Sequence, residues 1–270
     1  ALRRPGRAMT TADAVPARAP GAGLLLAVAT AAIFASASLL FALQPLFAKL
    51  ALPLLGGSPA VWTTALAFYQ TALVAGYLYA DRVQRLRQLD RQAGLHAVAL
   101  LAAAVIALPV SVSTLLGSPP SGAPTLWFLG VLTVSIGAPF IALSATAPLV
   151  QAWVARGAPG VDPYPLYAAS NLGSIAALLA APLLIEPAFG GQAQAMGWSI
   201  GFGLGAALIV AAGFIAARQG AAAPTVAADA TPRPGAATRW RERAIWAACA
   251  FAPSLLLAGV TVHISTDVAA

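Results

Sequence analysis

Seven long stretches without a charged side chain dominate this sequence. The stretches are Leu24–Phe47, Val61–Ala80, Ala97–Leu116, Leu126–Val150, Leu166–Ile185, Ala195–Ala217 and Ala244–Val262. A helix of roughly 20 apolar residues crosses the hydrocarbon layer of a membrane. None of the stretches alternates apolar and polar residues, as the strands of a membrane barrel do. The sequence therefore predicts an all-α fold, a polytopic bundle of transmembrane helices with about seven spans.

The composition excludes several other classes of protein. Hydrophobic residues make up 60% of the chain and charged residues only 9%, whereas soluble domains carry about 25% charged residues. An ordinary soluble enzyme and a disordered chain are therefore excluded. With one cysteine, two histidines and eight acidic residues, we expect no disulfide framework, no metal site and no cofactor in this part of the protein.

The basic residues predict the orientation of the chain. All but one of the 15 lysines and arginines precede the first apolar stretch or lie in every second connection, and Lys49 is the exception. Because basic residues collect on the cytoplasmic side, this places the N-terminus in the cytoplasm. The same distribution explains the isoelectric point near 10.5 without a nucleic-acid partner. The partner that we expect is the lipid bilayer.

Four parts of the chain follow from this pattern. Residues 1–22 form a cytoplasmic segment, residues 23–217 form a six-span bundle, and residues 218–243 read as a flexible cytoplasmic linker rich in Ala, Pro, Thr and Gly. Residues 244–270 hold a seventh span, which we interpret as the start of a second membrane unit. Since the chain opens without Met and stops after an apolar run, we expect it to be a fragment of a longer protein.

Polar side chains within or beside the apolar stretches are candidates for a solute path. They are Gln44, Lys49, Ser170, Asn171, His263 and Asp267. Lys49 either extends to the membrane interface or faces a cavity that receives an anionic group. Asn171 either joins helices or faces a ligand. His263 and Asp267, four residues apart, form either a polar helix end or a proton relay.

Glycines and prolines predict where helices approach and bend. Gly197, Gly201 and Gly205 have four-residue spacing, which is typical of close helix packing in membranes. A nucleotide loop is disfavoured there because no strand precedes these glycines. Four prolines inside the apolar stretches are each expected to kink a helix. These are Pro109, Pro139, Pro148 and Pro182.

The connection between the second and third stretches contains a possible signature. Gly76, Asp81, Arg82 and Arg85 resemble the signature loop of major facilitator transporters. The resemblance is imperfect, because one extra residue separates Gly76 from Asp81 and the usual loop glycine is replaced around residues 83–84. The alternative interpretation is an acidic residue beside arginines at the membrane surface. The resemblance implies a facilitator-like topology.

Three segments together resemble one family. They lie at residues 40–62, which include the sequence LFALQPLFAK, at 162–174, DPYPLYAASNLGS, and at 251–267, FAPS to HISTD. These segments are similar to the membrane portion of fused major-facilitator-like and spermidine-synthase-like bacterial proteins. The resemblance covers roughly residues 34–270. It implies a multi-pass protein of the bacterial inner membrane and a longer parent with a Rossmann-like, aminopropyltransferase-like domain.

The resemblance implies two possible functions. In the first, this membrane domain anchors the aminopropyltransferase-like domain and passes a polyamine or a related small solute to it. The alternative is a self-sufficient secondary transporter of the major facilitator type without enzymatic activity. Either function implies a small cationic or amino-acid-like solute as partner.

No catalytic residue is assigned in residues 1–270, because the glycine- and aspartate-rich loop after a strand, which an aminopropyltransferase needs, is missing from this stretch. We therefore expect the purified protein of residues 1–270 to show no aminopropyl or methyl transfer. The measurement is a transfer assay with labelled decarboxylated S-adenosylmethionine or S-adenosylmethionine and a diamine. Turnover above a protein-free blank would contradict this expectation.

Overall fold

The computed structural model describes residues 21–55, 58–112, 114–120, 124–222 and 236–263, and all regular structure in these ranges is helical. The elements are α1 (Ala22–Leu55), α2 (Pro59–Gln84), α3 (Leu89–Ala107), α4 (Pro124–Leu132), the π-helical turn η2 (Thr133–Gly137), α5 (Ala138–Gly157), α6 (Tyr164–Ala180), the π-helical turn η3 (Ala181–Ile185), α7 (Glu186–Ala188), α8 (Gly191–Ala222) and α9 (Ala236–His263). The all-α prediction is confirmed for this part of the chain.

Five helical stretches in the described part of the chain are long and apolar enough to cross a membrane. They are Ala22–Leu55, Leu89–Ala107, Pro124–Gly157, Tyr164–Ala188 and Gly191–Gly220. Helices α2 and α9 also have membrane length but are not among the five. Polar residues such as Gln70 lower the hydropathy of α2, and the first turns of α9 are charged. For these two helices a membrane span stays a prediction.

The third helix differs from its predicted bounds. We expected a span at 97–116, but α3 begins at Leu89 and ends at Ala107. Pro109 is the cause, because proline has no N–H and disfavours helical geometry in the preceding residue. Leu108 is accordingly extended, with φ −108° and ψ 144°. The prediction of a kink at Pro109 is therefore wrong, since this proline lies beyond the end of the helix.

Two of the other prolines coincide with local departures from α-helical geometry. Pro139 is the second residue of α5, just after the π-helical turn η2, and Pro182 lies inside the π-helical turn η3. A proline interrupts the backbone hydrogen bonds of a helix, and a π-helical turn accommodates the interruption without ending it. A local change in helical geometry therefore accompanies both prolines, while the predicted kinks stay predictions. Pro148 lies inside α5, which continues through it.

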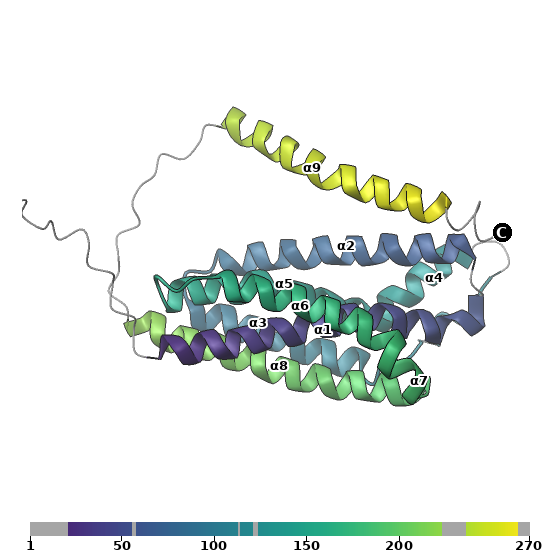
Figure 1. Ribbon diagram of the computed structural model, residues 1–270, viewed down its shortest axis with the longest axis horizontal. Helices are drawn as coiled ribbons and strands as arrows, with labels where there is room; N and C mark the ends of the chain where they lie inside the picture. The colour runs from purple at the N-terminus through teal and green to yellow at the C-terminus, as the bar shows by residue number, and fades with distance from the viewer. Residues whose placement is uncertain (1–20, 56–57, 113, 121–123, 223–235, 264–270) are drawn as a thin grey trace, which may run out of the picture.

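The long helices other than α9 pack side by side along the long axis of the bundle, and α9 lies outside it (Figure 1). The packed helices are α1, α2, α3, α5, α6 and α8. Helix α1 packs against α5, α6 and α8, while α5 also contacts α2 and α3. Large side chains such as Phe47, Phe140, Trp153 and Phe202 fill the core. The outer faces also carry many large apolar side chains. Apolar residues on the inside and the outside are expected of a bundle surrounded by lipid.

The connection between α8 and α9 is shorter than the linker that the sequence predicts. Helix α8 continues to Ala222 and α9 begins at Ala236, so both ends of the 218–243 segment are helical. Residues 223–235 lie outside the described part of the chain, as do residues 1–20. The cytoplasmic segment predicted at residues 1–22 and the seventh span predicted at residues 244–270 therefore stay predictions. Within these two segments the structure describes the start of α1 at Ala22 and the part of α9 up to His263.

Glycines allow the closest approaches between helices. A Cβ atom at Gly173 of α6 would lie 2.5 Å from the backbone oxygen of Phe34 in α1, and one at Gly205 of α8 would lie 3.0 Å from the side chain of Leu39. The neighbouring Gly201 also approaches Leu39. The packing role predicted for the glycines of α8 is thus confirmed at two of them. Gly197 has open space beside it.

We expect Gly173→Ala to destabilise the bundle, because the added methyl group would press on the backbone of α1. Overpacking of this kind costs about 1–3 kcal/mol. Gly203→Ala is the matched control, since nothing lies within 4 Å of its Cβ position and alanine favours helix by about 1 kcal/mol. Thermal unfolding in detergent, followed by circular dichroism, should give a lower midpoint for the first variant and an equal or higher one for the control. An unchanged midpoint for Gly173→Ala would contradict the close contact.

Candidate functional site

A cleft of about 530 Å³ opens between α1, the α6–α7 segment and α8. On the α6 side its wall is made of small residues at helical spacing, among them Ala177, Ala180 and Ala181. Facing them are larger apolar residues such as Leu39 and Leu46 of α1. The alanine side chains are too short to reach the opposite wall, which explains why space is left between helices that touch at Gly173.

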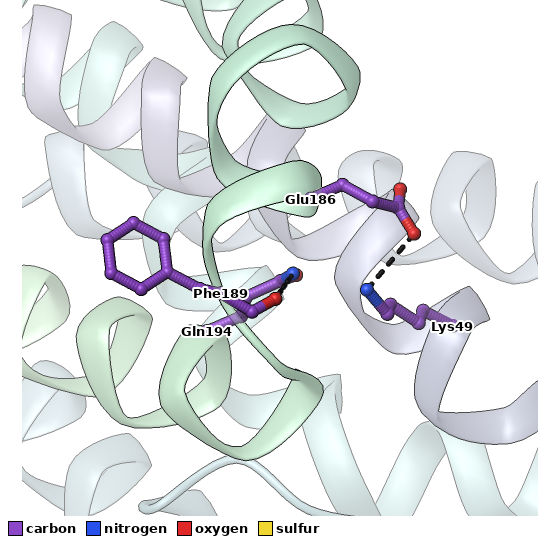
Figure 2. A network of polar contacts seen from close by, with 4 residues as sticks. All are labelled: Lys49, Glu186, Phe189 and Gln194. Atoms are coloured by element: carbon purple, nitrogen blue, oxygen red, sulfur yellow. Dashed lines mark hydrogen bonds and ion pairs between the residues drawn. The ribbon is translucent and has the colours of Figure 1, made fainter.

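One end of the cleft carries a pair of opposite charges. Lys49 Nζ of α1 lies 3.0 Å from Glu186 Oε1 of α7, and the two side chains are 34% and 58% exposed. Figure 2 shows the two side chains reaching toward each other across the gap between their helices. An ion pair this exposed contributes only about 0–1 kcal/mol. The pair therefore separates at low cost when another charged group is offered.

The remaining polar groups at the cleft already have hydrogen-bond partners. Trp198 Nε1 donates to the backbone oxygen of Leu39 at 2.8 Å. Ser38 Oγ lies 3.1 Å from the oxygen of Gly173 and donates to backbone carbonyls. Gln194 Nε2 donates to the oxygen of Phe189 at 2.7 Å (Figure 2). The Lys49–Glu186 pair is therefore the charged feature to which a ligand in this cleft would bind.

Of the six solute-path candidates from the sequence, Lys49 lines the cleft. Gln44 lies one residue before a lining proline, and its backbone oxygen accepts a hydrogen bond from Tyr69 Oη at 3.5 Å. Asn171 is exposed on α6, next to Ser170, whose oxygen accepts from Ser174. These polar residues of α1 and α6 therefore do not meet in one site.

The other two candidates lie elsewhere. His263 is the last described residue of α9 and is exposed. Asp267 lies outside the described residues, so the proposed relay between the two stays a prediction. Glu186, the partner of Lys49, is not among the six candidates from the sequence. The signal that would have paired them is that both are isolated charges at the same predicted end of the bundle.

The four residues of the facilitator-like signature do not form one cluster. Asp81 Oδ2 pairs with Arg85 Nη2 at 2.6 Å, one helical turn apart on α2 and well exposed. Arg82 is exposed beside them. Gly76 instead contacts α5, where its Cβ position meets the Ser144 side chain and the oxygen of Ile141. Gly76 thus has a packing role, while the charged residues lie at the end of α2.

A buried polar cluster was missed by the sequence reading. Gln92 Nε2 donates to the oxygen of Leu86 at 2.6 Å, and its Oε1 accepts from Trp153 Nε1 at 3.0 Å. His96 Nε2 lies 3.4 Å from Thr146 Oγ1. Gln92 and His96 are both fully buried. They precede the third apolar stretch, beside charged residues, and for that reason they were assigned to a connection.

A signal for this cluster was present in the sequence. Gln92 and His96 are followed at helical spacing by Leu100, Ala103 and Ala107, and all five are buried. That periodicity extends the buried face of α3 back into the charged segment.

His96 retains unused hydrogen-bonding capacity. Its Nδ1 atom and Tyr79 Oη are buried and have no partner among the residues that the structure describes. The ring centroids of His96 and Tyr79 lie 5.8 Å apart, and those of His96 and Trp153 lie 6.1 Å apart. No group of three metal-ligating side chains occurs in the described ranges. The cluster is therefore an interior hydrogen-bonding network with one histidine at its centre.

Comparison with known proteins gives no match, so a function has to be inferred from the geometry described above. No protein-family model matches the chain, and no match is found among curated proteins or solved structures. The family resemblance stated from the sequence segments accordingly stays a hypothesis.

We expect Gln92→Leu to destabilise the protein by about 1–3 kcal/mol, because it leaves the buried Trp153 N–H without a partner and removes the hydrogen bond to the Leu86 carbonyl. Gln70→Leu is the control, since Gln70 is exposed on α2 and leucine suits a lipid-facing position. Unfolding in detergent with increasing denaturant, followed by tryptophan fluorescence, measures both. Equal stability of the two variants would show that the network does not support the fold.

Proposed function

We propose that this protein is a secondary transporter whose substrate is a small zwitterion with an apolar tail, bound in the cleft between α1, α6–α7 and α8. The observation that supports the proposal is the Lys49–Glu186 pair at one end of an otherwise apolar cleft. The helices that form the cleft have the length and hydropathy of membrane spans.

Both charges of such a solute have a partner in the cleft. A carboxylate would replace Glu186 as the partner of Lys49, and an ammonium group would replace Lys49 as the partner of Glu186. One ion pair is then exchanged for two, and neither protein charge is left unpaired. Charge-assisted hydrogen bonds are about twice as strong as neutral ones. The apolar tail would lie against Leu39, Ala177 and Ala181.

The same charges disfavour a polyamine. A diamine needs a second acidic group, whereas the lining of the cleft offers one glutamate and one lysine. The lysine would repel a second ammonium group. Of the cationic and amino-acid-like solutes expected from the sequence, the amino-acid-like class fits this cleft better.

The proposal includes an orientation. Arginines from three parts of the chain gather at the end of the bundle opposite the charged cleft. By the positive-inside rule that end would face the cytoplasm, together with the N-terminus, and the charged mouth of the cleft would face outward. About seven spans in a bacterial inner membrane complete the proposed topology.

The function first implied by the family resemblance makes a different prediction. A domain that anchors an aminopropyltransferase-like domain and passes a polyamine to it should select cations. Selectivity between a zwitterion and a polyamine therefore separates the two functions.

The test is counterflow exchange in proteoliposomes that contain the full chain, with labelled leucine and labelled spermidine as probes. We expect saturable leucine exchange and a clear loss of it in Glu186→Gln and in Lys49→Met, because each variant leaves one charge of the solute without a partner in the cleft. Asp162→Asn is the control, since it neutralises an exposed carboxylate that does not line the cleft.

Two results would overturn the proposal. One is leucine exchange no faster than in protein-free liposomes. The other is spermidine exchange that exceeds leucine exchange, which would favour the function linked to an aminopropyltransferase.

A further inference from the structure

A second cavity lies at the other end of the bundle and differs in charge from the cleft. It has a volume of about 620 Å³ and is formed where the start of α3 meets the ends of α5 and α8. Arg87, Arg156 and Arg218 line it, with Asp90 as the acidic residue among them. Phe214 and Ala217 of α8 form an apolar side. We name this cavity the arginine pocket.

The arginine pocket has an excess of positive charge. The ion pairs among the described residues are Lys49–Glu186 and Asp81–Arg85, so none of the three pocket arginines is paired with a carboxylate in this part of the chain. Arg156 Nη2 donates to the oxygen of Gln84 at 3.1 Å, which fixes its position and leaves its other donors for a ligand. Planar guanidinium groups match the geometry of a phosphate oxygen pair.

Close helix packing brings the arginines together. A Cβ atom at Gly157, the residue after Arg156, would lie 3.0 Å from the backbone of Ala216 in α8. One at Gly220 would lie 2.8 Å from the side chain of Leu89 at the start of α3. These glycines bring the start of α3 and the ends of α5 and α8 close together. The fold therefore places the three arginines, which are exposed, around one cavity.

Exposed apolar side chains of α8 lead toward this pocket. Ile200, Leu204, Phe214 and Arg218 follow at helical spacing on one face, and Leu204 and Phe214 are 66% and 46% exposed. A ligand with both a phosphate group and an acyl chain would contact the arginines and this apolar face at once. Free phosphate would use only the first.

We propose that the arginine pocket binds the phosphate group of an anionic phospholipid, with an acyl chain along the exposed face of α8. Basic pockets between membrane helices bind such headgroups in general. The site is separate from the cleft and does not depend on which solute the cleft takes.

The test uses the full chain in neutral detergent and native mass spectrometry, with phosphatidylglycerol, phosphatidylcholine of the same acyl chains and inorganic phosphate as probes. We expect the protein to bind phosphatidylglycerol at least tenfold more tightly than the other two. Each arginine near an anionic headgroup contributes about fivefold in affinity. The double variant Arg87→Gln/Arg218→Gln should therefore bind phosphatidylglycerol about 30-fold more weakly.

Arg82→Gln/Arg91→Gln is the matched control. It removes the same charge from exposed residues near the same end of the bundle, and neither residue lines the pocket. We expect its affinity for phosphatidylglycerol to change less than threefold. Equal losses in the two double variants would overturn the proposal in favour of general surface attraction. Phosphatidylcholine bound as tightly as phosphatidylglycerol would also overturn it, and phosphate bound equally tightly would show a site for the free anion instead.

Discussion

The close contact of α1 with α6 and α8 is the constraint on which the rest of the structure depends. In lipid, apolar side chains gain little by leaving their surroundings, so helices associate through tight packing at small residues. Gly173 and Gly205 supply such contacts with Phe34 and Leu39 of α1. Beyond Gly173 the same side of α6 continues with alanines, and there the helices leave the space that becomes the cleft. One packing contact thus both joins the helices and determines where the cleft begins.

The two ends of the bundle differ in charge, and this difference supports two different ligand classes. At one end Lys49 and Glu186 balance each other beside apolar walls, which suits a solute that carries both charges. At the other end three arginines face a single aspartate, which suits an anion. Between them the interior holds the Gln92 and His96 network. Charged groups near the ends and hydrogen-bonded neutral groups inside are what a low-dielectric surrounding requires.

Several features of the fold were predictable because their causes are local. Helical apolar segments followed from long uncharged runs, and distortions at Pro139 and Pro182 followed from the missing proline N–H. The third helix was misplaced because hydropathy alone gave the position of the span, whereas Pro109 determined its end. His96 was missed for the same reason, since neighbouring charges concealed the buried face of α3. Of the predicted solute-path residues, Lys49 lies at the cleft because its helix end faces α7.

By itself, the sequence determined the helical class and the sorting of charge along the chain. Both are local consequences of backbone hydrogen bonding and of the cost of placing charge in an apolar medium. Only the tertiary structure decided which distant residues meet. It pairs Lys49 with Glu186 and Gln92 with Trp153, and it brings the three arginines of the arginine pocket around one cavity. Those partnerships depend on which helix faces pack together. That choice arises from the fit of small and large side chains between helices, which the spacing of residues along a single helix does not specify.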